Sequence, residues 1–258
     1  MTRMTPVVEK LLWINIGLFI AQSFLFLPLA HILGLHYVMS THFRVYQFLT
    51  HLFVHGSFMH LLCNMFSLYT FGPVLENTLS SKRFMAFYLG TGLGAAALYS
   101  GIRYLELGRI HTLYEQYLTF PDPERFHIFL QHFSTTTFDG LYRFSKLFFE
   151  YADDPAYIAK SKAIVDHLYT LKADMPTVGA SGAIFGILTG FAVLFPNVEI
   201  LIMFVPIPIK AKYFMALYAL YELHAGLQNN AADNIAHFAH LGGVLFGYLY
   251  IRQWKSYY

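Results

Sequence analysis

The sequence predicts an all-α polytopic membrane protein, a bundle of six transmembrane helices with a helical extramembrane insertion between the third and fourth. Three observations predict it: the composition, the apolar windows and the positions of the basic residues. Of the 258 residues, 56% are hydrophobic and 12% are charged, about half the charged share of an ordinary soluble domain. A soluble protein of this length could not bury so much apolar surface in one core, so the hydrocarbon of a bilayer is the expected solvent.

A transmembrane helix needs about 20 consecutive, mostly apolar residues. Six windows meet this requirement to different degrees, and they cover residues 11–33, 54–75, 83–104, 178–196, 210–228 and 235–252. The first window is too long for the apolar region of a signal peptide, so we expect an uncleaved first span. The apolar stretch 198–209 contains Pro206 and Pro208 and is too short to span, so a loop or a short extended piece is expected there.

Lysine and arginine gather at four places that lie on one side of a bundle with six spans. They flank the first, third, fifth and sixth windows as Arg3, Lys10, Lys82, Arg83, Lys210, Lys212, Arg252 and Lys255. Basic residues mark the cytoplasmic side of a membrane protein, so we expect both termini in the cytoplasm and the plasma membrane as the compartment. The net charge of +2, without a basic cluster, argues against a nucleic-acid partner.

Residues 105–174 are predicted to form the helical insertion. The stretch is charged and aromatic with several prolines, and residues 141–151 and 156–171 carry apolar side chains at helical spacing. A connection of this length is expected to have structure of its own. Counting the spans places it on the extracytoplasmic face, within a single membrane domain of residues 1–258.

Small residues recur at intervals of four in the fourth and sixth windows. They are Gly182, Gly186 and Gly190 in the fourth, and Ala239, Gly243 and Gly247 in the sixth. Small residues four apart let transmembrane helices approach closely. We therefore predict that the fourth and sixth spans pack face to face, which brings Ser181 to the same depth as His240.

Ser181 and His240 are of the types that hydrolases use as nucleophile and general base. A lone serine within a span is usually a packing hydroxyl, and a lone histidine is often a satisfied interior group. At matching depth, the neutral imidazole can take the hydroxyl proton and return it to the leaving amine. Attack on a carbonyl also needs hydrogen-bond donors for the oxyanion. His60 and Asn64, which share one helix face, can supply them, unless they are a polar clamp between helices.

Together these residues resemble the rhomboid family of intramembrane serine proteases. The likeness rests on His60-x-x-x-Asn64, Gly179-Ala180-Ser181-Gly182 and Ala239-His240-Leu241-Gly242-Gly243-x-x-x-Gly247. The order of these motifs and their placement on the second, fourth and sixth spans make the combination specific. The resemblance covers residues 40–104 and 175–252 most clearly and leaves the insertion out.

The resemblance implies a catalytic dyad of Ser181 and His240 without a third carboxylate, and it implies that His60 and Asn64 stabilise the oxyanion. His237, one turn before His240, is a rival base. We prefer His240 because glycines follow it at the third and seventh positions, as in the family helix.

The resemblance also implies the surroundings of the active site, namely His51, His55, Gly179 and Phe185. Phe185 can stack on the base but lacks the hydroxyl of the tyrosine that many relatives have. Residues 34–50 resemble the first loop, and residues 229–234 with the fifth span resemble the substrate gate. Many relatives have Trp-Arg before the second span, whereas this chain has Tyr46-Gln47, which puts the anchoring of the first loop in question.

We therefore expect a serine endopeptidase that cleaves peptide bonds in or next to transmembrane segments of membrane-protein substrates. The site would open to the extracytoplasmic side, and water would reach it through a polar cavity lined by His51, His55, His60 and Asn64. The family implies single-span substrates with a small residue before the cut. We expect no cofactor and no metal, and the oligomeric state is not predicted.

Three other classes stay open as alternatives. The first is a catalytically inactive rhomboid-like module that binds membrane proteins. The second is a metal site, since His51, His55 and His60 share the outer side of the second window. The third is a transporter or channel with Glu76, Glu199, Glu222 and His224 as relay groups. This third class is disfavoured because no inverted repeat is present, and Glu222 and His224 are more simply read as bonds between helices.

Overall fold

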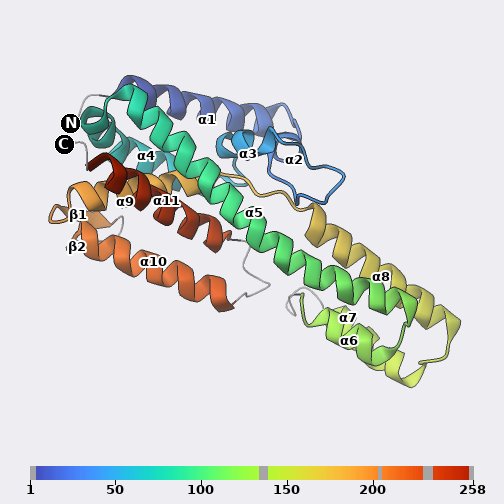
Figure 1. The fold of residues 1–258 in the computed structure, drawn as a ribbon. Helices are drawn as coiled ribbons and strands as arrows, with labels where there is room; N and C mark the ends of the chain where they lie inside the picture. Colours follow the sequence, from blue (N-terminus) through green and yellow to red (C-terminus); the bar gives the residue numbers. More distant parts are fainter. Residues whose placement is uncertain (1–3, 134–138, 203–204, 229–234, 256–258) are drawn as a thin grey trace.

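The computed structural model describes residues 4–133, 139–202, 205–228 and 235–255, which are mostly helical (Figure 1). Each predicted window overlaps a helix: α1 (Pro6–Phe24), α4 (Phe58–Leu79), α5 (Ser81–Thr119), α9 (Ser181–Leu194), α10 (Ala211–Gln228) and α11 (His237–Lys255). Within the described ranges, α1, α4 and α5 are long and apolar enough to cross a membrane, and α9 is a shorter apolar helix.

Shorter elements connect these helices. Between α1 and α4 lie α2 (Leu29–Leu33), α3 (Gln47–Thr50) and the 3₁₀ helix η1 (His51–Phe53). Strands β1 (Glu199–Ile202) and β2 (Val205–Lys210) pair antiparallel, with Glu199 opposite Lys210. Of the two forms predicted for residues 198–209, a loop or a short extended piece, the described residues take the extended one.

The first helix begins earlier than the window at residues 11–33 predicted. Pro6 is the first residue of α1, where the missing N–H of proline costs nothing. The carboxylate of Glu76 in α4 accepts hydrogen bonds from the N–H groups of Val7 and Val8, at 3.1 and 3.0 Å. A buried acid from another helix thus caps α1, and Glu76 is a structural group.

Helix α9 lies at the centre of the bundle and is in contact with α4, α5, α10 and α11. A Cβ placed on Gly243 would lie 2.1 Å from the carbonyl oxygen of Gly182, and one on Gly247 would lie 2.8 Å from the Cα of Gly186. The backbones of α9 and α11 therefore touch along both glycine ridges. The predicted face-to-face packing is confirmed.

Helix α5 continues beyond residue 104, where the sequence predicted its span to end. Its 39 residues make it about 58 Å long at the usual rise of an α-helix, because no proline interrupts it before Pro121. Its second half joins α6 (Pro123–Leu130), α7 (Asp139–Glu150) and α8 (Pro155–Asp174), which project beyond one end of the bundle (Figure 1). The helices predicted at residues 141–151 and 156–171 are thus present as α7 and α8.

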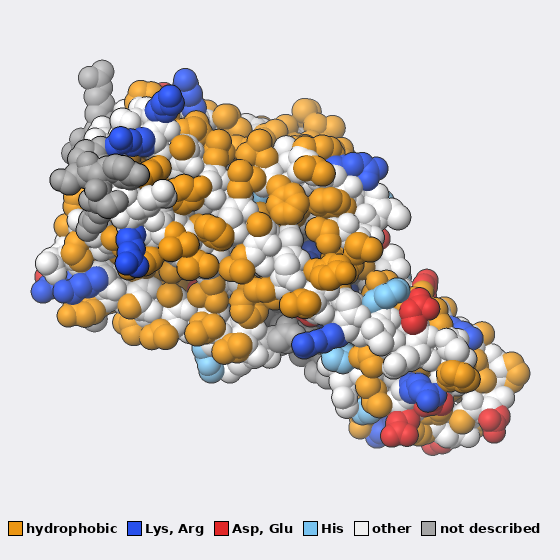
Figure 2. All heavy atoms as spheres, in the orientation of Figure 1, with side chains coloured by type: hydrophobic (Ala, Val, Ile, Leu, Met, Phe, Trp, Pro, Cys, Tyr) orange, Lys and Arg blue, Asp and Glu red, His pale blue; other side chains and the backbone are white. Residues whose placement is uncertain are grey.

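This projecting part has a hydrophobic core of its own. Its fully buried side chains include Tyr117, Phe126, Phe129, Phe148 and Val165. On the face shown in Figure 2, apolar side chains cover the body of the bundle. Acidic side chains gather on the projecting part, and basic side chains lie at the opposite end, near the junction and on the projecting part. The bundle therefore presents an apolar surface suited to lipid, with charges at its two ends.

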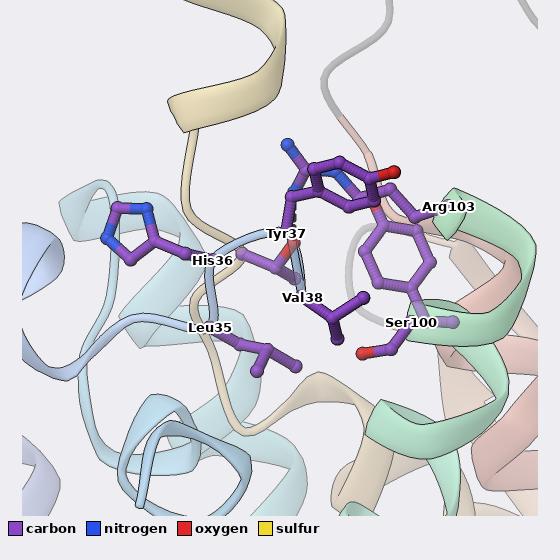
Figure 3. A pocket seen from close by; sticks show the side chains of 8 residues that line it. Leu35, His36, Tyr37, Val38, Ser100 and Arg103 are labelled. Atoms are coloured by element: carbon purple, nitrogen blue, oxygen red, sulfur yellow. Dashed lines mark hydrogen bonds between the residues drawn. The ribbon is translucent and has the colours of Figure 1, made fainter. Parts of the chain in front are cut away.

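A pocket lies where the projecting part meets the bundle (Figure 3). It is lined by Leu35, His36, Tyr37, Val38, Tyr99, Ser100, Arg103 and Thr177. Arg103 donates hydrogen bonds to the carbonyl oxygens of Lys172 and Met175, at 2.8 and 2.7 Å. Leu35 and Thr177 pair through two backbone hydrogen bonds of 2.8 and 2.9 Å. These contacts fix the segment that leads from α8 into α9.

Candidate active site

Ser181 is the first residue of α9 and is partly exposed, while the residues that follow it are buried. Gly179, two residues earlier, has φ of +120°, a backbone conformation that favours glycine. The N–H of Gly179 donates to the carbonyl oxygen of His51 at 2.9 Å. This turn therefore sets where α9 starts, and it leaves the first N–H groups of the helix without a partner inside the helix.

His240 lies on α11 and stacks on Phe185, one turn after Ser181. The ring centroids are 4.3 Å apart and the planes differ by 9°. Gly243 allows this closeness, since a Cβ there would lie 2.9 Å from the Cβ of Phe185. No hydrogen bond joins the Ser181 hydroxyl to His240 within the described residues, and such bonds often tighten only when substrate binds.

His60 and Asn64 lie one turn apart on one face of α4, a helix that contacts α9. The His60 ring lies against Gly179, where a Cβ would be 2.6 Å from the ring Nε2. Asn64 is buried, and its Nδ2 donor has no hydrogen-bond partner in the part of the chain that the structure describes. Buried donors in folded proteins are nearly always paired. An unpaired amide one turn from His60 is therefore suited to an acceptor that comes from outside the chain.

His51 and His55 precede α4, outside the spanning helices. His51 donates from Nδ1 to the carbonyl oxygen of Gln47 at 2.9 Å, so its ring bonds to the preceding turn while its own carbonyl holds Gly179. His55 is fully buried beside His60, with ring centroids 5.1 Å apart. Burial lowers the pKa of His51 to about 4 and the pKa of His55 to about 3. Both rings are therefore neutral near pH 7.

The described residues do not test the predicted polar cavity or the predicted gate. The residues that line the pocket described above do not include His51, His55, His60 or Asn64, so the cavity predicted around those four stays a prediction. The gate was predicted at the fifth span with residues 229–234. The fifth span is present as α10, residues 229–234 lie outside the described residues, and the gating role stays a prediction.

The side chain of Gln47 anchors the first loop, residues 34–50. Gln47 is buried, and its side-chain oxygen accepts a hydrogen bond from the N–H of Arg44 at 3.0 Å. Its amide nitrogen donates to the carbonyl oxygens of His42 and Ile32, at 3.0 and 3.3 Å. The amide of Gln47 thus ties the loop to α2 and α3 in a chain that lacks the Trp-Arg pair.

One acidic side chain beside His240 was not predicted for this site. Glu222 on α10 is buried, and its Oε2 accepts a hydrogen bond from Nδ1 of His237 at 2.6 Å. The same oxygen lies 3.0 Å from Nδ1 of His240, although the N–H is not aligned for a hydrogen bond. The bond between helices expected of Glu222 is confirmed by its contact with His237. Its closeness to His240 differs from the dyad without a carboxylate that the resemblance implies.

Glu222, His237 and His240 also form the one group, among the described residues, whose ligand atoms could hold a metal ion, all within 4.8 Å of one another. The predicted metal rival of His51, His55 and His60 does not form such a group there. The 2.6 Å distance from Oε2 of Glu222 to Nδ1 of His237 is that of a hydrogen bond, so this oxygen already has a partner without an ion.

The apolar helical bundle and its charged ends define an integral membrane protein. Residues 42–107 and 155–254 match the Rhomboid domain, and the chain belongs to the rhomboid family. It is 27% identical over 199 residues to "Rhomboid protein 1, mitochondrial" of Saccharomyces cerevisiae, which covers 77% of this chain and 38% of that protein. It is 26% identical over 224 residues to an uncharacterized mitochondrial rhomboid protein of Schizosaccharomyces pombe, which covers 82% of this chain and 52% of that protein. The chain thus spans about half or less of the length of these relatives.

Proposed function

We propose that this chain is an intramembrane serine endopeptidase that cleaves peptide bonds in or next to transmembrane segments of membrane proteins. The observation that carries the proposal is the stacking of His240 on Phe185, one turn after Ser181, at 4.3 Å between ring centroids. Membership of the rhomboid family supports the same activity. Ser181 is the nucleophile and His240 the general base in this proposal.

In the proposed reaction, Nε2 of His240 takes the proton of the Ser181 hydroxyl as the oxygen attacks the carbonyl carbon. Negative charge then develops on the carbonyl oxygen, and preorganised donors stabilise it. His60, Asn64 and the free N–H groups at the start of α9 are the candidate donors. His240 returns its proton to the leaving amine, and a water activated by the same base releases the acyl group from Ser181.

We further propose the six-span topology, with residues 105–174 as an insertion in one membrane domain of residues 1–258. The start of α1, the end of α11 and the β1–β2 hairpin lie at the same end of the bundle (Figure 1), where basic side chains gather (Figure 2). This arrangement supports the placement of both termini on the same side of the membrane, the side that basic residues mark. The Rhomboid match leaves out residues 108–154, a narrower segment than the predicted insertion.

The proposed partners are transmembrane protein substrates within the lipid bilayer, and the site is proposed to open on the side opposite the termini. The two relatives are named mitochondrial, so they do not support the plasma membrane expected from the sequence. Fractionation of cells that express a tagged chain decides between the two compartments.

A transporter has less support than a protease. Glu76, one predicted relay group, caps α1 and accepts a hydrogen bond from Ser81 at 2.6 Å. His224 pairs with Gln228 on the surface of its own helix, at 2.8 Å. Each of these polar groups has a local structural partner, so no relay needs to be invoked for them.

Cleavage of a single-span substrate by the chain reconstituted in liposomes tests the proposal. Wild type is expected to cut, and Ser181→Ala and His240→Ala are expected to be inactive while they keep the wild-type melting temperature. Ser67→Ala is a matched control, because that hydroxyl bonds to the Cys63 carbonyl of its own helix at 2.9 Å. Undiminished cleavage by Ser181→Ala would mean that a contaminating protease cuts the substrate. The chain itself would then be better described as an inactive binding module.

A further inference from the structure

We propose that Glu222 is a positioning residue for the base, so that this chain uses a serine–histidine–glutamate arrangement in place of a bare dyad. The inference rests on the proposed function. It concerns a carboxylate on α10 that the family resemblance did not supply.

Two contacts fix the imidazole of His240, one on its face and one at its edge. Phe185 holds the ring face at 4.3 Å between centroids and 9° between planes. Glu222 holds the ring edge, with Oε2 3.0 Å from Nδ1. A carboxylate beside Nδ1 favours the tautomer with its proton on that nitrogen. Nε2 is then unprotonated, as a general base requires, and the imidazolium formed after proton transfer is stabilised by the negative charge.

His237 offsets part of the free-energy cost of burying the Glu222 carboxylate. Glu222 is only 2% exposed, and a buried carboxylate without partners is strongly destabilising. The hydrogen bond of 2.6 Å from His237 Nδ1 supplies a partner. The rival base considered from the sequence is thus engaged by the same oxygen that faces His240, so it acts as a second support for Glu222.

Other titratable groups face this cluster and would contribute to its pH dependence. Tyr218 of α10 contacts Phe185 at 4.7 Å between centroids, and Tyr221 of α10 lies 6.4 Å from His237. His60 of α4 faces the same site, because its ring lies against Gly179, just before α9 begins. Glu222 is the negatively charged group in direct contact with Nδ1 of His240.

The test measures kcat, KM and the pH–rate profile of Glu222→Gln in liposomes. Glutamine keeps the shape and a hydrogen-bond acceptor but removes the charge that stabilises the imidazolium. We expect kcat to fall roughly tenfold to a hundredfold, a part of the about 10²–10⁴ that a positioned base contributes, with little change in KM. The acid limb of the profile should move to lower pH, since the neutral form of the base then persists further into acid.

Glu76→Gln is the matched control. Glu76 is also 2% exposed, but it lies about 24 Å along α4 from His60 at the usual helical rise. It is expected to lower the melting temperature and to leave the acid limb unchanged. If Glu222→Gln does not fold, Glu222→Asp replaces it. Aspartate keeps the charge but withdraws it by one methylene, so kcat should fall while the acid limb stays near that of wild type.

Three outcomes overturn the proposal. The first is a wild-type kcat and pH profile in Glu222→Gln, and the second is a loss of kcat with an unmoved acid limb, as expected of a merely structural group. The third is stoichiometric zinc in purified Ser181→Ala that is lost on Glu222→Gln, which would make the cluster a metal site. A wild type that neither cleaves nor reacts with a fluorophosphonate sinks the proposed function, and Glu222 loses its role with it.

Discussion

The imidazole of His240 lies parallel to the ring of Phe185, 4.3 Å away, and this relationship fixes the proposed base relative to α9. Phe185 is one turn after Ser181 on the same helix. The stacking therefore fixes the position of the His240 imidazole relative to Ser181. The glycines of α9 and α11 make that packing close enough.

Removal of the ring at position 185 is expected to slow the reaction. Phe185→Leu keeps an apolar side chain but loses a stacked pair worth about 0.5–1.5 kcal/mol, so kcat should fall roughly twofold to tenfold. Phe185→Tyr keeps the ring and is expected to retain activity. Steady-state cleavage rates check both variants, and a fully active Phe185→Leu would show that the stacking does not position His240.

A side chain at position 179 is expected to disable the site. Gly179→Ala places a methyl group about where the His60 ring lies and forces alanine to φ of +120°, a conformation that costs about 1–3 kcal/mol. We expect a lower melting temperature and loss of cleavage. Gly101→Ala is the control, because a Cβ at Gly101 meets nothing within 4 Å. Equal activity of the two variants would contradict the placement of His60.

Loss of the Gln47 amide is expected to release the first loop. Gln47→Leu leaves the carbonyl oxygen of His42 without the donor of its 3.0 Å bond and removes one of the two donors to the carbonyl oxygen of Ile32. A buried polar group left unpaired costs about 1–3 kcal/mol. Thermal unfolding should move to lower temperature. Tyr46→Phe removes one exposed hydrogen bond to Ile32 and should change little. A thermally neutral Gln47→Leu would mean that the loop is anchored elsewhere.

Stability is expected to fall as the pH drops from 7 to 5. In the folded chain, burial lowers the pKa of His51 to about 4 and the pKa of His55 to about 3. In the unfolded chain both histidines have the ordinary pKa of about 6.5. Below about pH 6.5 the unfolded state binds more protons than the folded state, so the free energy of unfolding decreases as the pH falls. Melting temperatures across this range check the effect. His55→Phe should flatten the dependence, and an unchanged slope would contradict it.

The sequence was most informative where function depends on local spacing. The glycine intervals predicted the packing of α9 on α11, and the spacing of His60 and Asn64 predicted their shared face on α4. These features depend on helical periodicity, which a single sequence displays directly. The length of α5 was not predicted, because the apolar window ended near residue 104, whereas the helix runs to Thr119.

Contacts between helices that are adjacent only in the fold were harder to predict. The closeness of Glu222 to His240 depends on how α10 is rotated against α11, and no spacing along the chain encodes that rotation. The only signal was a buried-type acid within an apolar span. Gln47 was likewise noticed as a departure from the family pattern, but its hydrogen bonds to His42 and Ile32 arise from the folded path of the first loop.

The most direct test of the central claim is the site of covalent labelling by a serine-directed fluorophosphonate. Wild-type protein in liposomes is expected to carry one adduct, and peptide mass spectrometry is expected to place it on Ser181, with no adduct in His240→Ala or Ser181→Ala. Labelling of Ser181→Ala to the same extent as wild type would contradict the assignment of Ser181 as the nucleophile.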